Sequence, residues 1–472
     1  MSKRVYINTI GCQMNVYDSE RIVNSLIPLG YETTPSVESA DLIITNTCTI
    51  REKAEQKAFS FLGRLAKLKR KNKDLIIAVG GCVAQQQGQT ILKRMSHVDL
   101  VFGTRALGRL PLAIEKIAKQ RCRIVDVDMS SSLEDEALQS HVLKADTVSK
   151  FVTIMRGCDN FCAYCVVPHV RGRETSRDPA LIIKEIEQLV NEGVREVTLL
   201  GQNVNSYGKK EGLCTFVELL SRINTIEGLS RIRFTTSHPK DLSGELINAF
   251  GSLEKLCNHL HLPIQSGSNR ILKRMNRKYT REAYLTKVAE LRVACPEISI
   301  TTDIIVGFPG ETLADFEDTL SLIRQMRYDS LFVFNYSDRP LVPSRKFTPK
   351  VPEKDKNTRL QQVLDVQKTI TEEIHAARVG QTMPVLVEGH SKRQKMEYSE
   401  RIDTPLQWSG RTTCNKIVNF IADGSTKAAP ADFTGETVCV SIERALSHSL
   451  WGKLKEKASD CSALKGDRSY AA

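Results

Sequence analysis

Short apolar runs alternate with stretches in which apolar residues recur every three or four positions over the first 120 residues. The apolar runs, which predict β-strands, lie at residues 4–9, 42–45 and 75–79. The periodic stretches, which predict helices, lie at 18–30 and 51–70. Because such alternation favours a parallel sheet, we expect an open parallel α/β domain over residues 3–120. A linker is expected at 121–146, most of which is acidic and rich in Ser.

The same alternation continues over residues 147–378, which end in a long charged helix at 353–378. Strand-like runs lie at 151–155, 196–200, 232–235, 259–263, 299–305 and 330–335. A closed barrel of this type has eight β/α units, and this region has two fewer. We therefore expect a partial (β/α)6 barrel, with a doubly wound sheet as the alternative.

The C-terminal region has a different pattern. Short strand-like segments separated by Gly, Asp and charged turns over residues 379–446 predict a small antiparallel β-barrel. The polar tail at 452–472 is expected to be disordered.

Composition supports a globular protein of several domains. A chain of 472 residues is longer than a single hydrophobic core usually supports. Its contents of 41% hydrophobic and 26% charged residues are ordinary for globular domains. No run spans a bilayer and no signal-peptide pattern is visible, so we expect a cytoplasmic protein without membrane contact, with its thirteen cysteines reduced. The net charge of +12 favours a polyanionic partner, although a solvated basic face is the alternative.

Three cysteines lie close together after the first strand of the six-unit region, in "CDNFCAYC". They are Cys158, Cys162 and Cys165. Loops at the carboxyl ends of parallel strands are where such folds place their chemistry. With His169, the spacing leaves a Cys-Cys-Cys-His zinc site open. The short, apolar and aromatic spacing favours an iron-sulfur cluster bound by three thiolates.

A second trio consists of Cys12, Cys48 and Cys82, which are 36 and 34 residues apart. Each follows a predicted strand, in "VYINTIGC", "LIITNTC" and "IIAVGGC". Parallel strands end at one edge of a sheet, so we expect the three thiols to converge there and to hold a second cluster. Three unrelated buried cysteines are the alternative.

Together these features resemble the methylthiotransferases, a family of radical S-adenosylmethionine enzymes, over nearly the whole chain. The resemblance rests on motifs such as "GCQMNVYDSE", "NTCTIREKAEQK", "GGCVAQ", "LLGQNVNSYG", "HLPIQSGS" and "DIIVGFPGET". They are most similar to the tRNA-2-methylthio-N6-dimethylallyladenosine synthases. The resemblance implies methylthiolation at carbon 2 of N6-dimethylallyladenosine at position 37 of tRNA. It also implies that the C-terminal barrel is a TRAM domain that binds RNA.

The resemblance also implies two 4Fe-4S clusters and S-adenosylmethionine as cofactors. The cluster on Cys158, Cys162 and Cys165 leaves one iron for S-adenosylmethionine and generates a 5′-deoxyadenosyl radical. The cluster on the N-terminal trio carries the sulfur. Several strand-end residues resemble motifs with which the family binds S-adenosylmethionine. They are Gly201, Gln202, Asn203, Gln265, Ser266 and Asp303. The alternative is that these segments only form tight turns.

One motif departs from the family. Where the family reads Arg-Pro-Gly-Thr-Pro, this chain has Leu341 and Val342 in the third and fourth places. This replacement puts the turn and its substrate contacts in question rather than the reaction class.

Other partners and activities stay open at this point. We expect a monomer that takes electrons from a donor the sequence does not identify. In the C-terminal barrel we expect phosphate contacts from Lys392, Arg393, Lys395, Arg401, Arg411 and Lys416, and stacking on Trp408 and Phe420. The barrel could instead only cap the catalytic domain. Alternative functions are methylthiolation of threonylcarbamoyladenosine in tRNA or of a ribosomal protein, and a zinc-stabilised RNA-binding protein without catalysis.

Overall fold

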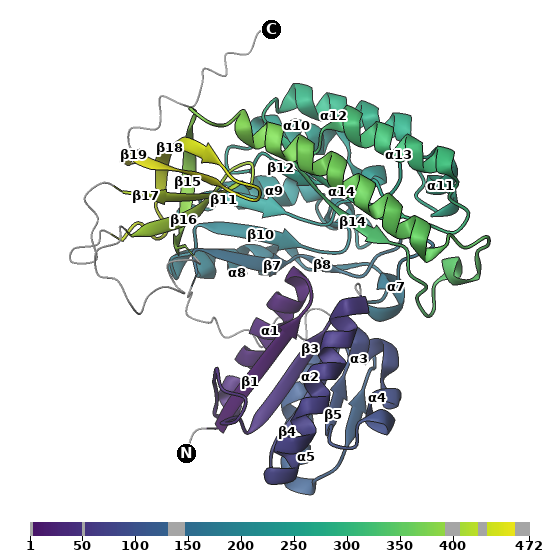
Figure 1. The fold of residues 1–472 in the computed structure, drawn as a ribbon. Helices are drawn as coiled ribbons and strands as arrows, with labels where there is room; N and C mark the ends of the chain where they lie inside the picture. The colour runs from purple at the N-terminus through teal and green to yellow at the C-terminus, as the bar shows by residue number, and fades with distance from the viewer. Residues whose placement is uncertain (1–2, 50–51, 131–146, 392–405, 423–431, 458–472) are drawn as a thin grey trace.

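The structure is a computed structural model that describes residues 3–49, 52–130, 147–391, 406–422 and 432–457. Three bodies are visible in Figure 1: an N-terminal α/β domain below, a β/α body in the centre and a small β-barrel beside it. The expected combination of folds is therefore confirmed.

The N-terminal domain is an all-parallel sheet in the order β2-β1-β3-β4-β5-β6. Its strands are β1 (Lys3–Ile10), β2 (Tyr31–Thr33), β3 (Leu42–Thr47), β4 (Ile76–Gly81), β5 (Leu100–Phe102) and β6 (Ile124–Asp126). Its helices are α1 (Gln13–Leu26), α2 (Glu52–Lys71), α3 (Cys82–Gln87), α4 (Gln89–Arg94) and α5 (Leu110–Gln120). Separate apolar clusters fill its two faces. Because β6 pairs with β5, the expected domain end at 120 is wrong and the sheet includes the first part of the expected linker.

The central body holds six parallel strands in chain order. They are β7 (Ser149–Thr153), β10 (Glu196–Leu200), β11 (Arg231–Phe234), β12 (His259–His261), β13 (Ser299–Val306) and β14 (Ser330–Asn335). They form two three-stranded sheets, and an isolated parallel β-bridge joins Ile232 of β11 to Leu256, three residues before β12. The covering helices are α8 (Pro179–Asn191), α9 (Phe216–Asn224), α10 (Gly244–Ser252), α12 (Arg281–Ala294), α13 (Leu313–Met326) and α14 (Glu353–Ala376). One continuous apolar core joins strands and helices, as expected for a partial barrel.

The C-terminal barrel closes in the order β15-β16-β17-β19-β18. Its strands are β15 (Thr382–His390), β16 (Gln407–Thr412), β17 (Ile417–Ile421), β18 (Thr437–Ala445) and β19 (Leu450–Lys457). Strand β19 pairs with both β17 and β18. The expected domain end at 446 is therefore wrong, and residues 452–457 belong to the barrel rather than to a tail; residues 458–472 lie outside the described part.

This small barrel packs against the amino-terminal ends of the central strands. Arg231 and Arg233, on β11, donate hydrogen bonds to carbonyl oxygens of residues 411–413 at 2.5 to 3.0 Å. The buried Lys416 forms an ion pair with the partly buried Asp329, just before β14, at 2.6 Å. The turn between β16 and β17 therefore closes one end of the partial barrel, and the loops that follow the strands lie at the other end.

The N-terminal domain meets those loops through α1 and α3. Met14 and Tyr17 of α1 pack against Phe151 and Leu200. The Tyr17 hydroxyl lies 3.3 Å from Oε1 of Glu185 on α8. The sheet edge with the N-terminal cysteines therefore faces the carboxyl ends of the central strands (Figure 1).

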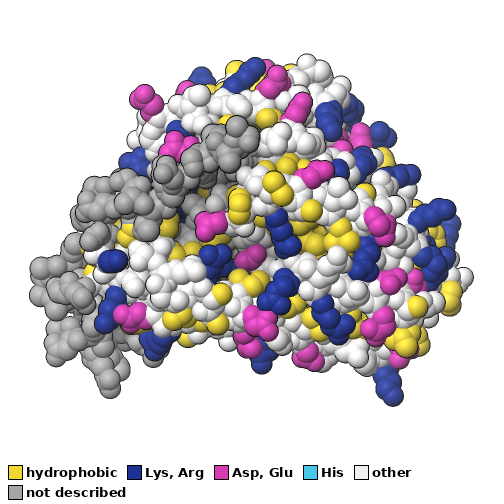
Figure 2. Space-filling model, turned by 90° about the horizontal axis from the view of Figure 1, so that it is seen from above, with side chains coloured by type: hydrophobic (Ala, Val, Ile, Leu, Met, Phe, Trp, Pro, Cys, Tyr) yellow, Lys and Arg dark blue, Asp and Glu magenta, His cyan; other side chains and the backbone are white. Residues whose placement is uncertain are grey.

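The surface in Figure 2 shows Lys and Arg side chains interspersed with acidic ones, and they do not gather into one basic patch on that face. Within the described residues, no helix is long and apolar enough to cross a membrane.

Candidate functional site

The first cysteine trio lies in the loop between β8 (Met155–Arg156) and α7 (Val167–Val170). Cys162 is buried, and Cys158 and Cys165 are partly buried. Cys162 lies close enough to act electrostatically on both Cys158 and Cys165, and Cys158 acts on Cys165, so the three thiols lie near one another as expected. Burial raises the pKa of Cys158 to about 11 and that of Cys165 to about 12. Both thiols are therefore protonated near neutral pH on their own. Metal ligands must be deprotonated, so binding of a metal site would release these protons.

Two residues that the sequence analysis missed contact Cys162. Arg277, which follows α11 (Asn269–Arg274), is buried, and its Nη1 donates to the Cys162 sulfur at 3.3 Å. Nε2 of His238 lies 4.0 Å from the same sulfur. Burial, Arg277, Lys240 and Lys287 lower the pKa of His238 to about 2, so this imidazole is neutral. The loop thus offers a fixed cation and a neutral ring beside one sulfur.

A single metal ion has no ligand set here. Within the described residues, no three His, Cys, Asp or Glu side chains converge closely enough to hold one ion. His169 and the three cysteines are therefore not arranged in the described residues as the ligands of one ion. A 4Fe-4S cluster is larger than one ion, so three thiolates that held one would lie farther apart than the ligands of a single ion.

The strand ends beside this loop carry buried polar atoms that find no hydrogen-bond partner among the described residues. They are Oδ1 of Asn203, both side-chain polar atoms of Asn205, Oγ of Ser237 and Oε1 of Gln265. Buried polar groups are normally paired, so their grouping fits a polar ligand such as S-adenosylmethionine. Gln202 supports the cysteine loop directly, because the Gly157 amide donates to its Oε1 at 2.5 Å.

The other expected contacts lie in two settings. Asp303, on β13, is 3.5 Å from His261 and only partly buried. Ser266 is fully buried, and its hydroxyl accepts from the Ser268 amide and lies 3.4 Å from the Thr319 hydroxyl. Gly201 follows β10, where an added Cβ would meet Met155. Which of these residues touch S-adenosylmethionine stays a prediction.

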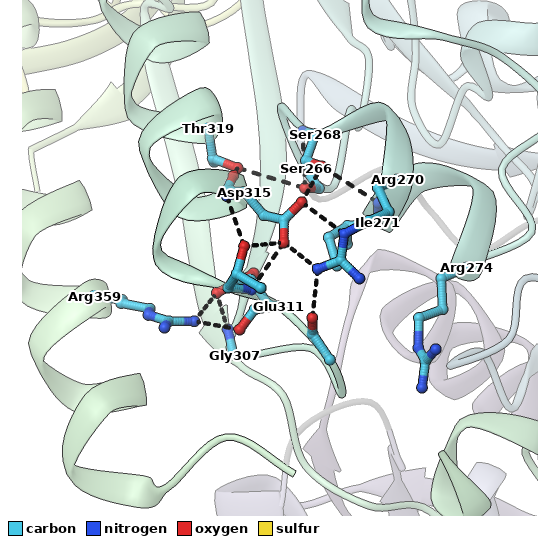
Figure 3. A network of polar contacts seen from close by, with 12 residues as sticks. Ser266, Ser268, Arg270, Ile271, Arg274, Gly307, Glu311, Asp315, Thr319 and Arg359 are labelled. Carbon is cyan, nitrogen blue, oxygen red and sulfur yellow. Dashed lines mark hydrogen bonds and ion pairs between the residues drawn. The ribbon is translucent and has the colours of Figure 1, made fainter. Parts of the chain in front are cut away.

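Asp315 of α13 connects the loops that follow β12 and β13 (Figure 3). Its carboxylate accepts from the Ser268 hydroxyl at 2.6 Å and from the Thr312 amide at 2.8 Å, and it pairs with Arg270. Glu311 accepts from the Gly307 amide at 2.9 Å and from Arg359 at 2.5 Å. This network holds the "SGS" and "GFPGET" segments in place.

The second trio lies at the carboxyl edge of the N-terminal sheet. Ile10, Thr47 and Gly81 are in register on β1, β3 and β4, and a cysteine follows each strand end. The sheet order places a topological switch point between β1 and β3, where such sheets bind ligands. An added Cβ on Gly11 would lie 2.9 Å from the Cβ of Cys48. The chain therefore brings these thiols together as expected.

Asn15 and Asn46 hold this edge. The Cys12 amide donates to Oδ1 of Asn15 at 3.3 Å, and Nδ2 of Asn15 donates to Oδ1 of Asn46 at 3.0 Å. A hydrogen bond with Cys48 lowers the pKa of Cys12 to about 6. Burial raises the pKa of Cys82, although Arg171 acts to lower it. The spacing of the cysteines contained no signal for Asn15 or Arg171.

Leu341 and Val342 now have a structural context. Leu341 has φ 71°, the left-handed conformation that Gly adopts without strain, and its side chain is exposed. Val342 is buried against Cys82, Val166 and Val170. A cleft of about 760 Å³ beside this turn is lined by both domains, including Arg94 and Phe59 on one side.

The expected stacking surface is wrong. Trp408 and Phe420 are 1% and 0% exposed and form the core of the C-terminal barrel. Lys416 is engaged with Asp329, and Arg411 pairs with Glu388 at 2.9 Å. The other expected basic residues, Lys392, Arg393, Lys395 and Arg401, lie outside the described residues. Among the described aromatic residues of the barrel, Trp451 is partly exposed, and the Arg444 guanidinium lies 4.1 Å from its ring centroid.

Comparisons with known proteins agree with this arrangement. Residues 4–103 match the family described as "Uncharacterized protein family UPF0004", and residues 152–323 match the "Radical SAM superfamily". Proteins named tRNA-2-methylthio-N6-dimethylallyladenosine synthase are similar over nearly the full length. The one from Desulfosudis oleivorans is 55% identical over 95% of this chain and 96% of its own. The chain belongs to this family.

Other relatives extend the match. The synthase of Geobacter metallireducens is 51% identical over 96% of this chain and 98% of its own, and that of Syntrophus aciditrophicus is 49% identical over 96% and 94%. Among solved structures, the radical S-adenosylmethionine methyltransferase TsrM from Kitasatospora setae has a TM-score of 0.53 at 14% identity. That alignment covers 73% of this chain and 74% of TsrM, and shows the fold alone. The radical SAM family implies a 4Fe-4S cluster and S-adenosylmethionine in this chain.

Proposed function

We propose that this chain methylthiolates carbon 2 of N6-dimethylallyladenosine at position 37 of tRNA, next to the anticodon. Membership of the synthase family supports the reaction and the substrate. The observation that carries the proposal is the pairing of two three-cysteine sites at one domain interface, because this reaction needs a radical and a sulfur source.

In this proposal Cys158, Cys162 and Cys165 hold the radical-generating 4Fe-4S cluster. When bound, that cluster supplies the electron that cleaves S-adenosylmethionine. Arg277 fixes Cys162 and places positive charge beside its sulfur. Gln202 orders the loop through the Gly157 amide, and the unpaired oxygens of Asn203 and Gln265 are available to S-adenosylmethionine.

We assign a second 4Fe-4S cluster, which supplies the sulfur, to Cys12, Cys48 and Cys82. The convergence of three strand ends and the close approach at Gly11 support this assignment. Gly81, at φ 90°, supports it as well, because an added Cβ there would collide with the Thr47 carbonyl. Asn15 orders the turn that carries Cys12.

Two variants test the division of roles. The Cys162→Ala protein should form no 5′-deoxyadenosine from S-adenosylmethionine. The Cys48→Ala protein should still form it, should make no methylthio product, and should contain about half the iron, because one cluster of two is removed. Full 5′-deoxyadenosine formation by Cys162→Ala, or normal product from Cys48→Ala, would refute the respective role.

Nucleoside analysis tests the substrate. The tRNA of cells without this protein should contain dimethylallyladenosine that lacks the methylthio group, and the intact gene should restore it. Loss of methylthio from threonylcarbamoyladenosine instead would place the chain in another branch. For a protein that acts on tRNA we expect a cytoplasmic location, and we expect a monomer.

The C-terminal barrel is proposed to hold tRNA through Arg444, Trp451 and Lys453. Trp451 provides a partly exposed ring under the Arg444 guanidinium, and Lys453, two residues farther along β19, is an exposed cation that lies 3.6 Å from Glu443. Removing the barrel would uncover the buried Arg231 and Arg233, so point variants are the cleaner test. Lys453→Met should weaken tRNA binding. The slope of the logarithm of the binding constant against the logarithm of the salt concentration should also become shallower, by about one unit for each phosphate that is no longer neutralised.

A further inference from the structure

The two cysteine sites are joined by a short piece of chain. Helix α7 begins two residues after Cys165 and packs on α3, which begins at Cys82. Cys82, Val166 and Val170 belong to one buried apolar cluster, and the Thr104 hydroxyl donates to the Val170 carbonyl at 2.7 Å. The residue that follows α7 therefore lies close to the N-terminal cysteine site.

The residue that follows α7 is Arg171, which is only 3% exposed. Its Nη2 donates to Oδ2 of Asp18 at 2.9 Å, and Nη2 of Arg156 lies 3.5 Å from the other Asp18 oxygen. Asp18 lies on α1, which begins directly after Cys12. One carboxylate of the N-terminal domain thus fixes the guanidinium that the central domain supplies.

Among the described residues, one end of that guanidinium lacks a close hydrogen-bond acceptor, and Arg171 acts as a hydrogen-bond donor toward the Cys82 thiol. Nη1 of Arg171 is buried and makes no hydrogen bond within the described residues. Besides Asp18, the groups that act electrostatically on Arg171 include Cys82 and Cys12. A buried N–H group without an acceptor is costly, and the sulfurs of an iron-sulfur site are acceptors.

We propose that Arg171 is a positioning residue of the N-terminal cysteine site, with its Nη1 directed at the anionic sulfurs and its charge offsetting theirs. This inference rests on the proposed second cluster. It means that a residue of the central domain completes the N-terminal site. The positive charge of Arg171 is therefore present at the site only when the two domains are docked. Hydrogen bonds and positive charge near a cluster raise its reduction potential.

The test measures the reduction potential of the second cluster alone. In a full-length protein with Cys158, Cys162 and Cys165 replaced by Ala, iron content is determined and the potential is titrated by electron paramagnetic resonance. Adding Arg171→Met should lower the potential enough to change the ratio of reduced to oxidised cluster at least tenfold, which is about 59 mV for one electron. Arg171→Lys should restore most of this shift.

Arg177→Met is the matched control. Arg177 is also buried at this interface, where it pairs with Glu185 at 2.7 Å, and the strongest charges acting on it come from Glu185, Tyr17 and Tyr207. Its replacement should leave the potential unchanged. An unchanged potential in Arg171→Met, or equal shifts in Arg171→Met and Arg177→Met, would overturn the role of Arg171 while the second cluster stands. If the triple-Ala background binds no iron, the second cluster itself is refuted.

Discussion

Replacing Asp315 with Asn should loosen the two loops that follow β12 and β13, next to the expected S-adenosylmethionine contacts. The Asp315 carboxylate accepts from the Ser268 hydroxyl, the Thr312 amide and hydroxyl, and Arg270 (Figure 3). Asn keeps one oxygen but turns an NH2 group toward some of these donors. The hydroxyls can rotate to accept from it, but the Arg270 guanidinium cannot.

The magnitude follows from the hydrogen bonds that Asn cannot accept. Hydrogen bonds to a charged group contribute roughly 1.5 to 3 kcal/mol, and the effect here falls at the lower end of that range because the Arg270 side chain is 52% exposed. In Asp315→Asn we expect the free energy needed to open the two loops to fall by about 2 kcal/mol. This corresponds to a roughly thirtyfold larger equilibrium constant for opening.

The dependence on pH has a definite sign. Burial alone would raise the pKa of Asp315, but hydrogen bonds from Arg270, Ser268 and Thr312 outweigh it and lower the pKa. The stabilisation is therefore fully present above the unfolded pKa of about 3.9, and it is lost as the pH falls through the lower folded value. The difference between Asp and Asn should be constant near neutral pH and should shrink in acid.

Hydrogen exchange followed by mass spectrometry measures this opening locally, without the need for two-state unfolding. The segment 263–275 should exchange roughly thirtyfold faster in Asp315→Asn at about pH 7. Asp318→Asn, an exposed carboxylate on the same helix, should exchange like the unmodified protein. Equal exchange in Asp315→Asn and the unmodified protein would refute the reasoning.

Two other predictions follow from local geometry. Leu341→Gly should stabilise the protein by about 1 kcal/mol, because Gly relieves the left-handed strain at φ 71°, and a thermal melt that does not rise would contradict this. Lys416→Met should leave Asp329 without its ion-pair partner and weaken docking of the C-terminal barrel by about 3 kcal/mol. Limited proteolysis near residues 377–381 should become faster in that variant, and unchanged cleavage would show that the ion pair is not needed for docking.

The sequence by itself determined the elements and the two cysteine trios. Apolar runs with helical stretches between them located all six strands of the partial barrel to within two residues at each end, because strand and helix periodicities are local properties. The cysteines could be grouped because parallel strands end at one edge. The N-terminal register bears this out, with Ile10, Thr47 and Gly81 side by side.

Only the tertiary structure decided which side chains face inward and which distant segments meet. Trp408 and Phe420 pair across β16 and β17 on the inner face of a closed barrel, and the inner face depends on register and closure rather than composition. Strand β19 was missed because its pairing with β17 and β18 involves distant parts of the chain. Arg171 and Arg277 reach their cysteines through the docking of separate elements, and no local pattern distinguishes a buried arginine that contacts sulfur from one on the surface.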